Sequence, residues 1–294
     1  MSEHINEFSH FLRNKRNISE NTSSAYISDI IAFYKYIQET YKKDILSVTK
    51  TMILTYMLDM QKKSKNAATI SRSLSSIKSF YGFMEDRGDI TKNPSNNIHA
   101  PRIEMKLPEY LSSEEIDKLL ELPDINSAKG YRDKTMLELM YSTGIKVSEL
   151  LDLKTGDYNP SSESLSINKK NNTRRVPVGS QAKLYLETYL SERRNALVNA
   201  DTKDVMFVNL SGTHMSRQGF WKILRQYARG AGINRRITPQ IIRNSFVVHL
   251  LQNGSDINTL QILFGQNSIS AIQMYLKTQE KHTFEIYRKS HPRA

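Results

Sequence analysis

The sequence predicts a mainly α-helical protein of two domains, with one small β-hairpin or sheet in the second domain. Apolar residues recur at helical spacing through most of the 294 residues. Residues 91–111 contain three prolines and no helical period, which is typical of a linker between domains. Residues 163–178 alternate in character on either side of a polar turn, as a β-hairpin does.

Residues 1–90 are expected to form a helical first domain of four or five helices. The first helix is indicated by an apolar stripe at Ile5, Phe8, Phe11 and Leu12. The later boundaries follow from capping residues and a glycine: Asn21 and Thr22 at the start of the second helix, Thr49 before the third, Asn66 before the fourth and Gly88 after it.

The second domain is expected to span residues 112–294 and to be mainly helical. Residues 112–115 read Ser-Ser-Glu-Glu, a helix start with acidic residues at the positive end of the helix dipole. A long helix is expected near residues 131–142, and another begins within residues 143–153. The rest is expected to be helical after the hairpin, with breaks at 209–212, 230–232 and 253–255.

The charge balance favours an anionic macromolecular partner. The chain has 42 Lys and Arg against 30 Asp and Glu, a net charge of +12. Nucleic acid is the commonest large polyanion that such a surface attracts. The alternative is a basic protein whose charge only keeps it soluble.

Other features of the composition exclude several classes of site. There is no cysteine, which excludes a disulfide scaffold and thiolate metal sites. The histidines have no paired ligand spacing, so no metal or other cofactor is expected. No signal peptide or membrane-spanning apolar run is evident, and a cytoplasmic protein without a membrane partner is expected.

Several blocks of sequence point to one family when they are taken together. Residues 143–159, 168–178 and 237–278 resemble, in order and spacing, the catalytic domain of the tyrosine site-specific recombinases. The similarity is strongest to the Xer-type branch, and residues 18–37 and 71–84 resemble that branch's core-binding, SAM-like domain. The resemblance implies a DNA-binding first domain and a tyrosine-recombinase catalytic-type second domain.

The resemblance also implies a chemistry. Members of this family attack a DNA phosphodiester with a tyrosine hydroxyl, which forms a 3′-phosphotyrosyl link and frees a 5′-hydroxyl. The covalent link conserves the bond energy, so neither ATP nor metal is needed. The developing negative charge needs cationic donors, usually two arginines, and proton transfer is assisted by lysine and histidine side chains.

Three of the residues implied by the resemblance are retained in this sequence. Tyr275 stands at the nucleophile, Arg243 at the second arginine and Lys169 at the hairpin lysine. Taken alone, each has a plainer interpretation as a packed tyrosine, a salt-bridge partner or a solvated turn lysine. Their place within the blocks is what indicates the site.

Other positions of the expected site are replaced. Lys146 stands at the first arginine, Gln240 and Gln266 stand at histidines, and Asn244 follows Arg243 where histidine is usual. Lysine keeps the charge of arginine but not its two-pronged hydrogen bonding. Losing one preorganised donor costs on the order of 3 kcal/mol, and losing an acid–base group costs roughly a hundred- to ten-thousandfold in rate. The sequence therefore predicts a degenerate site with slowed or absent cleavage.

Basic residues in both domains are candidates for contacts with duplex DNA. The candidates are Arg72 and Lys78 in the first domain and Arg174, Arg175, Arg217, Gln218, Arg235 and Arg236 in the second. Ser71, Ser73 and Ser76 would complete a polar stripe beside Arg72 and Lys78, although an ordinary solvated helix face is the alternative. The two domains would together form a clamp round the duplex.

The resemblance implies a tetramer on DNA, of one kind of subunit or mixed with an active recombinase. The tail residues Phe284, Ile286 and Tyr287 resemble a terminal helix that docks in a neighbouring subunit, and the alternative is that this helix folds back on its own domain. Three functions stay open: a DNA-binding protein that occupies recombination-type sites, a working recombinase, and an activity like that of type IB topoisomerases.

Overall fold

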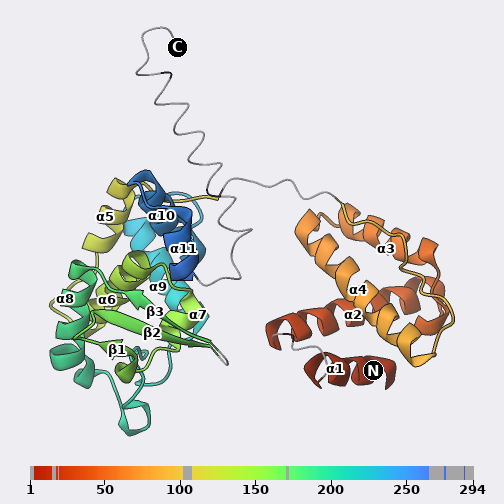
Figure 1. The fold of residues 1–294 in the computed structure, drawn as a ribbon, viewed down its shortest axis with the longest axis horizontal. Coiled ribbons are helices and arrows are strands. Elements are labelled where there is room, and N and C mark those ends of the chain that lie inside the picture. The colour runs from red at the N-terminus through yellow and green to blue at the C-terminus, as the bar shows by residue number, and fades with distance from the viewer. Residues whose placement is uncertain are drawn as a thin grey trace. The chain divides into compact units, whose positions relative to one another are not determined.

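The computed structural model describes residues 3–14, 18, 20–101, 108–169, 172–264, 275 and 288. The chain divides into two compact units, Met1–Met105 and Lys106–Ala294 (Figure 1). The mainly α fold with one small sheet confirms the predicted fold class. None of the described helices is long and apolar enough to cross a membrane.

The N-terminal unit is a bundle of helices, as predicted. Its described elements are α1 (Glu3–Asn14), α2 (Glu20–Tyr41), the short 3-10 helix η1 (Ile45–Ser47), α3 (Lys50–Lys62) and α4 (Ala67–Arg87). The Asn66 side chain caps α4 by accepting a hydrogen bond from the Thr69 amide, and Gly88 ends it at a φ of 81°. The predicted cap at Asn21 and Thr22 is wrong, because α2 already begins at Glu20.

The core of this unit is aromatic and extends into the segment that follows α4. Phe8 of α1 meets Phe80 of α4 edge to face, with ring centroids 5.3 Å apart. The Tyr81 hydroxyl donates to the carbonyl of Ile45 at 2.8 Å. Ile98 is buried in the same core. The first part of the proline-containing segment therefore packs as part of the N-terminal unit.

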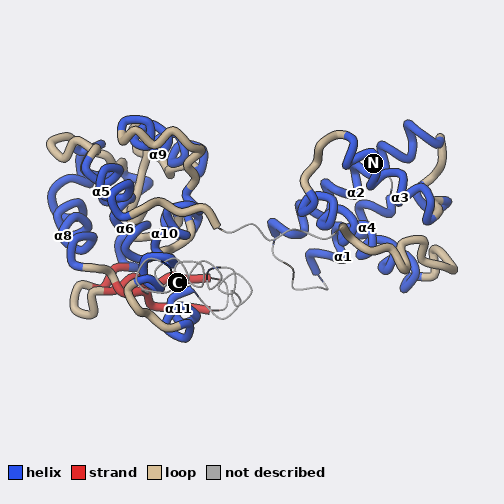
Figure 2. The backbone as a smooth tube through the Cα atoms, turned by 90° about the horizontal axis from the view of Figure 1, so that it is seen from above, coloured by secondary structure: helices blue, strands red, loops and turns tan. Residues whose placement is uncertain are grey.

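The C-terminal unit combines helices with a three-stranded antiparallel sheet. Its described α-helices are α5 (Ser113–Glu121), α6 (Ala128–Thr143), α7 (Val147–Leu151), α8 (Ser180–Thr188), α9 (Arg217–Gly230), α10 (Pro239–Gln252) and α11 (Ile257–Phe264). The strands are β1 (Tyr158–Asn159), β2 (Ser164–Lys169) and β3 (Asn172–Pro177), in the order β1-β2-β3. Figure 2 shows the strands on one side of this unit, with α11 close to β3.

Most local predictions for this unit are confirmed, with one correction. Ser112 and Glu115 form the expected capping box at the start of α5. The predicted hairpin is β2 with β3, paired so that Lys169 lies opposite Asn172. Residues 203–216, expected to be helical apart from the break at 209–212, contain turns and isolated bridges instead. The backbone here bonds to other segments: Val205 pairs with Lys154, and the Met206 amide donates to the carbonyl of Leu153.

Candidate active site

Helix α10 carries three of the residues singled out by the sequence. It begins after Thr238 with Pro239 at its first position, where a missing amide proton costs nothing. Almost all of the helix is buried, including Arg243 and Asn244, whereas Gln240 on its first turn is exposed. A buried arginine and a buried amide on one helix must find partners inside the protein.

Arg243 is held between the α6–α7 turn and α11. One of its guanidinium nitrogens donates to the carbonyl of Gly144, and the guanidinium lies 3.8 Å from the centroid of the Phe264 ring. Burial lowers the pKa of Arg243 to about 10, and the nearby Glu149 carboxylate opposes this shift. Because this pKa lies well above neutral pH, the group stays a cation suited to a phosphate oxygen.

Gly144 allows the close approach that places Arg243. It caps α6 at a φ of 57°, a conformation that favours glycine. A Cβ at this position would collide with the Phe246 ring, which is also on α10. Glycine in the Thr-Gly-Ile-Lys sequence is therefore required both by the turn and by the packing of α10 against it.

The Glu149 carboxylate accepts hydrogen bonds from two basic residues, Lys146 at the start of α7 and Arg174 of β3. It accepts a hydrogen bond from the Lys146 amide at 2.9 Å, and it accepts both prongs of the Arg174 guanidinium at 3.0 and 2.7 Å. Burial raises the pKa of Glu149, but the Arg174 fork outweighs it and the pKa is lowered. Arg174 also donates to the carbonyl of Leu263 at 3.0 Å, so this arginine joins β3 to α7 and α11.

Sequence reasoning predicted Arg174 as a DNA contact and did not single out Glu149. The structure places most of the Arg174 donors on protein acceptors. The available signal was a glutamate inside the same sequence block as Lys146, at the third position of a helix, where its carboxylate can turn back to the helix start.

Tyr275 is buried against an amide pair from α10. Its hydroxyl donates to Oδ1 of Asn244 at 2.7 Å, and Nε2 of Gln240 donates to the same oxygen at 2.9 Å. Nδ2 of Asn244 in turn donates to the carbonyl of Glu109 at 2.7 Å. Burial raises the pKa of Tyr275, although the Arg243 charge and a hydrogen bond from Gln240 work in the opposite direction. The Tyr275 side chain is therefore a neutral phenol near neutral pH.

The structure gives less information on the other residues predicted for the site. Lys146 is exposed at the start of α7, and its backbone is fixed by Glu149. Lys169 ends β2, and Gln266 and the tail residues Phe284, Ile286 and Tyr287 lie outside the described residues, as does the Lys169 side chain. The structure thus brings together Tyr275, Gln240 and Asn244, with the Arg243 charge close enough to act on Tyr275.

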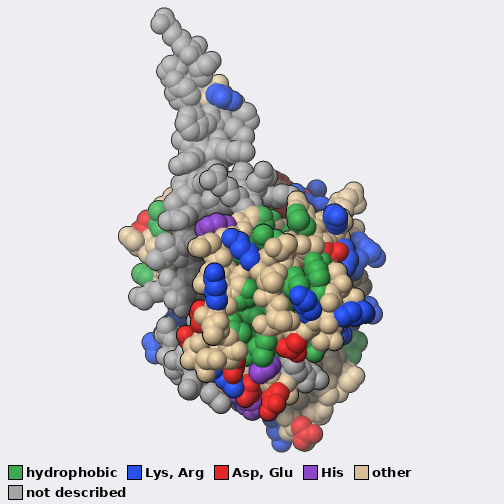
Figure 3. Space-filling view, turned by 90° about the vertical axis from the view of Figure 1, so that its right-hand side faces the viewer, with side chains coloured by type: hydrophobic (Ala, Val, Ile, Leu, Met, Phe, Trp, Pro, Cys, Tyr) green, Lys and Arg blue, Asp and Glu red, His purple; other side chains and the backbone are tan. Residues whose placement is uncertain are grey.

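The predicted DNA-contact residues of the C-terminal unit fall into two groups. Arg175, Arg217 and Gln218 are exposed, the last two on the first turn of α9. Arg235 and Arg236 have protein contacts: Arg235 pairs with Glu115 and donates to the Tyr110 carbonyl, while Arg236 lies 5.6 Å from the centroid of the Trp221 ring. Figure 3 faces the N-terminal unit instead, where Lys and Arg side chains are interspersed with acidic, hydrophobic and uncharged ones.

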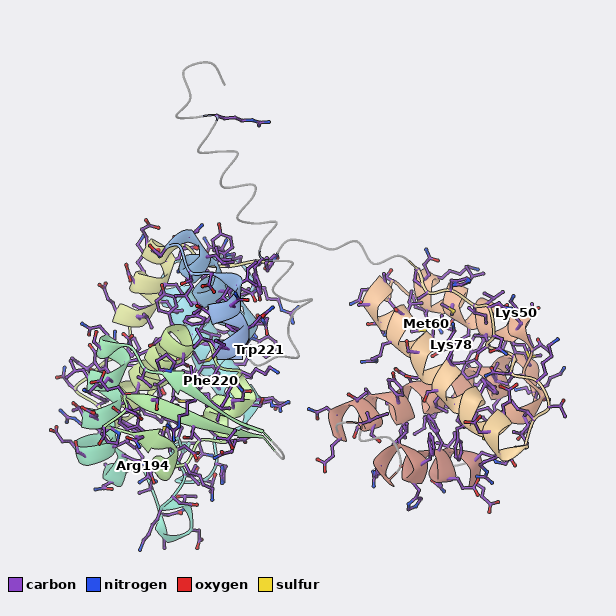
Figure 4. All side chains as sticks on the ribbon, in the orientation of Figure 1. Lys50, Met60, Lys78, Arg194, Phe220 and Trp221 are labelled. Atoms are coloured by element: carbon purple, nitrogen blue, oxygen red, sulfur yellow. The ribbon has the colours of Figure 1, made fainter. Side chains whose placement is uncertain are left out.

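The predicted polar stripe on α4 is wrong in part. Ser73 and Ser76 are buried rather than exposed, and the Ser76 hydroxyl donates to Asp29 of α2 at 2.9 Å. Arg72 donates two hydrogen bonds, of 3.0 and 2.8 Å, to the same Asp29 carboxylate. Lys78 is exposed on α4 (Figure 4).

Three kinds of polar group make up the described part of the site. They are the Tyr275 hydroxyl, the buried Arg243 guanidinium and the hydrogen-bonding amides of Gln240 and Asn244. Within the described part of the chain, no group of three or more histidine, aspartate or glutamate side chains is arranged to hold a metal ion. The chemistry that these residues can perform is attack by an oxygen nucleophile on a bound anionic group.

Comparison with known proteins identifies the class to which this fold and site belong. The description "Phage integrase family" matches residues 109–282, and "Phage integrase, N-terminal SAM-like domain" matches residues 5–88. The chain belongs to the phage integrase family of tyrosine recombinases, whose reaction is DNA strand exchange.

Relatives narrow this to the Xer-type branch. The tyrosine recombinase XerD of Oceanobacillus iheyensis is 42% identical over 296 residues, which covers 99% of this chain and 98% of that protein. The tyrosine recombinase XerD of Staphylococcus haemolyticus is 35% identical over 291 residues, with 99% of each chain covered. The chain is therefore a Xer-type tyrosine recombinase by sequence.

Solved structures share the fold at low sequence identity. XerH bound to a palindromic difH substrate after cleavage has a TM-score of 0.74 and 19% identity, covering 96% of this chain and 83% of that one. A lambda integrase dimer bound to a core site has a TM-score of 0.72 and 17% identity, covering 92% and 93%. These likenesses support the fold.

Proposed function

We propose that this protein binds recombination-type sites on duplex DNA and cuts them slowly or not at all. Tyr275 would be the nucleophile, Arg243 would hold the scissile phosphate, and Lys169 would protonate the leaving oxygen. Lys146, Gln240 and Gln266 would occupy the remaining positions of the same pocket. DNA binding is supported by the net charge of +12 and by relatives and structural neighbours that are recombinases, several of them bound to DNA.

The observation that carries this proposal is the hydrogen bonding of the Tyr275 hydroxyl. Its acceptor is an asparagine oxygen that already receives a second hydrogen bond from Gln240. Neither amide has an accessible pKa, so neither can take the phenol proton when the oxygen attacks phosphorus. The phenol must then lose its proton to water or hydroxide, which is a slow route near neutral pH.

The phosphate side of the site supports the same conclusion more weakly. Arg243 keeps a buried guanidinium in the site, but Lys146, at the position of the first arginine, supplies a point charge in place of the other guanidinium fork. A lysine donates one hydrogen bond where an arginine would donate two parallel ones. Binding of a phosphate would be retained while the stabilisation of its transition state is reduced.

The second candidate is a working recombinase, and its specific support is the retention of Tyr275, Arg243 and Lys169 in a chain 42% identical to a recombinase. In either case we propose a tetramer on DNA, of identical subunits or mixed with an active recombinase, and a cytoplasmic location. An inactive subunit in such an assembly would hold its own strand uncut.

A suicide DNA substrate separates the two candidates. Nicked duplex carrying the bound site is incubated with the protein, and the covalent protein–DNA adduct is measured over time. The proposal expects adduct formation at least about a hundredfold slower than for an active relative on its own site. A fast adduct that disappears in Tyr275→Phe would establish the working enzyme, and absence of any duplex binding at low salt would refute both candidates.

A further inference from the structure

A cationic cavity in the C-terminal unit is lined by residues other than those described above around Tyr275. It has a volume of about 510 Å³ and lies between α9 and the loop of residues 233–237. Its polar lining is Trp221, Arg225, Arg229, Asn234, Arg235 and Arg236, over an apolar floor. This is the size range of small-ligand sites, but the four guanidinium groups and the lack of any acidic lining residue select an anion.

Three of these four arginines can interact with a bound anion, because the ion pairs found among the described residues do not involve them. Arg235 shares its charge with Glu115. Within the described ranges, the ion pairs of this unit leave Arg225, Arg229 and Arg236 without a carboxylate partner. Like charges gathered around one cavity repel one another, and an anion placed between them removes that repulsion.

Trp221 organises this arrangement. It lies on the same face of α9 as Arg225 and Arg229, at successive steps of four residues. The guanidinium carbons of Arg225 and Arg236 each lie 5.6 Å from the centroid of its ring. The ring nitrogen donates to the carbonyl of Ile237 at 3.0 Å, which ties α9 to the loop (Figure 4). The arginines are thereby partly ordered before a ligand arrives.

We propose that this cavity, the tryptophan–arginine pocket, binds a phosphodiester of duplex DNA other than the one that Tyr275 would attack. The inference rests on the proposed DNA binding and adds to it a second, defined phosphate site. Guanidinium forks match the oxygens of a phosphate. The Trp221 ring is already contacted by two guanidinium groups, so its part is to hold the arginines rather than to stack on a base. The exposed Arg217 and Gln218 start the same helix.

The pocket is linked by hydrogen bonds to the residue that holds Tyr275. Arg235, on its rim, donates to the carbonyl of Tyr110. Asn244, which accepts the Tyr275 hydroxyl, donates to the carbonyl of the preceding residue, Glu109, and the Leu111 amide donates to Ser245 of α10. A phosphate in the pocket would therefore stabilise the position of residues 109–111 against α10.

Trp221 is the only tryptophan of the chain, so its fluorescence reports on the pocket alone. The full-length protein is titrated with a duplex that it binds and, separately, with inorganic phosphate, in parallel with the double variant Arg225→Gln, Arg229→Gln. The matched control is Lys118→Gln, Lys203→Gln, which removes the same charge from exposed positions outside the pocket. Circular dichroism melting checks that both variants are folded, and Arg225→Lys, Arg229→Lys keeps the charge without the forks.

We expect duplex to change the Trp221 emission of the wild type and of the control, and to change it little in the pocket variant. Duplex affinity of the pocket variant should fall about tenfold, and the slope of log affinity against log salt should decrease by about 0.9 for each phosphate that the variant no longer binds. The lysine double variant should lie between the two.

Two results would overturn the pocket. The first is duplex binding with unchanged Trp221 emission and with equal salt slopes for the pocket and control variants, which would leave the proposed DNA binding intact. The second is a response to inorganic phosphate that the pocket variant abolishes, without any response to duplex, which would make the pocket a site for free anions. If no duplex binds at all by mobility shift, the proposed function fails as well, and the mobility shift distinguishes the two failures.

Discussion

The proposed site has two sides, one expected to bind the phosphate and one expected to take the tyrosine proton, and their side chains differ. On the phosphate side, the buried Arg243 donates a hydrogen bond to the carbonyl of Gly144. Glu149 accepts two hydrogen bonds from the Arg174 guanidinium. On the proton-transfer side, the Tyr275 hydroxyl meets Asn244 and Gln240, which are amides. The first group can bind a phosphate, whereas the second can hold a tyrosine in place but cannot accept its proton.

This difference shows that geometry and reactivity can be separated within one site. Amides reproduce the hydrogen bonds that a histidine would make, so the tyrosine stays ordered. They do not reproduce its titration near neutral pH. A protein with this combination would be expected to recognise its DNA better than it cuts it.

Restoring the proton-transfer side should produce the largest effect. Gln240→His with Asn244→His should raise the rate of covalent adduct formation by roughly a hundredfold or more, because an acid–base group contributes about that much. Lys146→Arg alone should give a smaller gain than the two histidines, in a suicide-substrate assay on the same duplex. The control adds Tyr275→Phe to each restored variant and should show no adduct. Restored proteins that bind the duplex and cut no faster would show that the defect lies elsewhere.

Breaking the phosphate side should cost stability. Glu149→Ala removes the carboxylate from half-buried Arg174 and from the neighbourhood of Arg243, and we expect a loss of about 3 kcal/mol in the free energy of unfolding. Urea unfolding measures it. Glu163→Gln, in the more exposed pair with Lys183, is the control and should change stability by less than about 1 kcal/mol. Equal effects would contradict the central place given to Glu149.

Gly144 tests whether the α6–α7 turn fixes the position of α10. Gly144→Ala should cost about 2 to 3 kcal/mol, because the left-handed backbone is strained and the new Cβ meets the Phe246 ring. Gly88→Ala, at a φ of 81° with open space around it, should cost only about 1 to 2 kcal/mol. A loss at Gly88 as large as the loss at Gly144 would mean that the packing against Phe246 contributes nothing.

The smallest expected effect is on the pH dependence of stability, to which Glu149 should contribute. Its pKa is lowered in the folded state, so its contribution is present above the pKa of the unfolded chain and is lost as the pH falls through the folded value. In Glu149→Gln the unfolding free energy should therefore fall less steeply with decreasing pH below about pH 4.5 than in the wild type. Parallel curves for the two proteins would show that Glu149 keeps an ordinary pKa in the folded protein.

Much of the local structure was determined by short-range sequence patterns. Asn66 and Gly88 bound α4, and Ser112 with Glu115 starts α5, because capping involves residues within four positions of one another. The hairpin followed from alternation and a polar turn, and the replacements at Lys146, Gln240 and Gln266 were visible in the sequence blocks. The helical expectation on either side of the 209–212 break failed, because local patterns do not show that Val205 pairs with Lys154, far away along the chain.

Tertiary structure decided the partners of the polar groups. Arg174 and Glu149 are 25 residues apart, and Asn244 and Glu109 are 135 apart, so no local pattern could pair them. The same holds for Arg72 and Asp29, and for the pairing of Tyr275 with Asn244. A sequence states which donors and acceptors a chain has. Burial decides which of them must be satisfied within the protein, since an unpaired polar group there costs free energy and the fold is selected to avoid it.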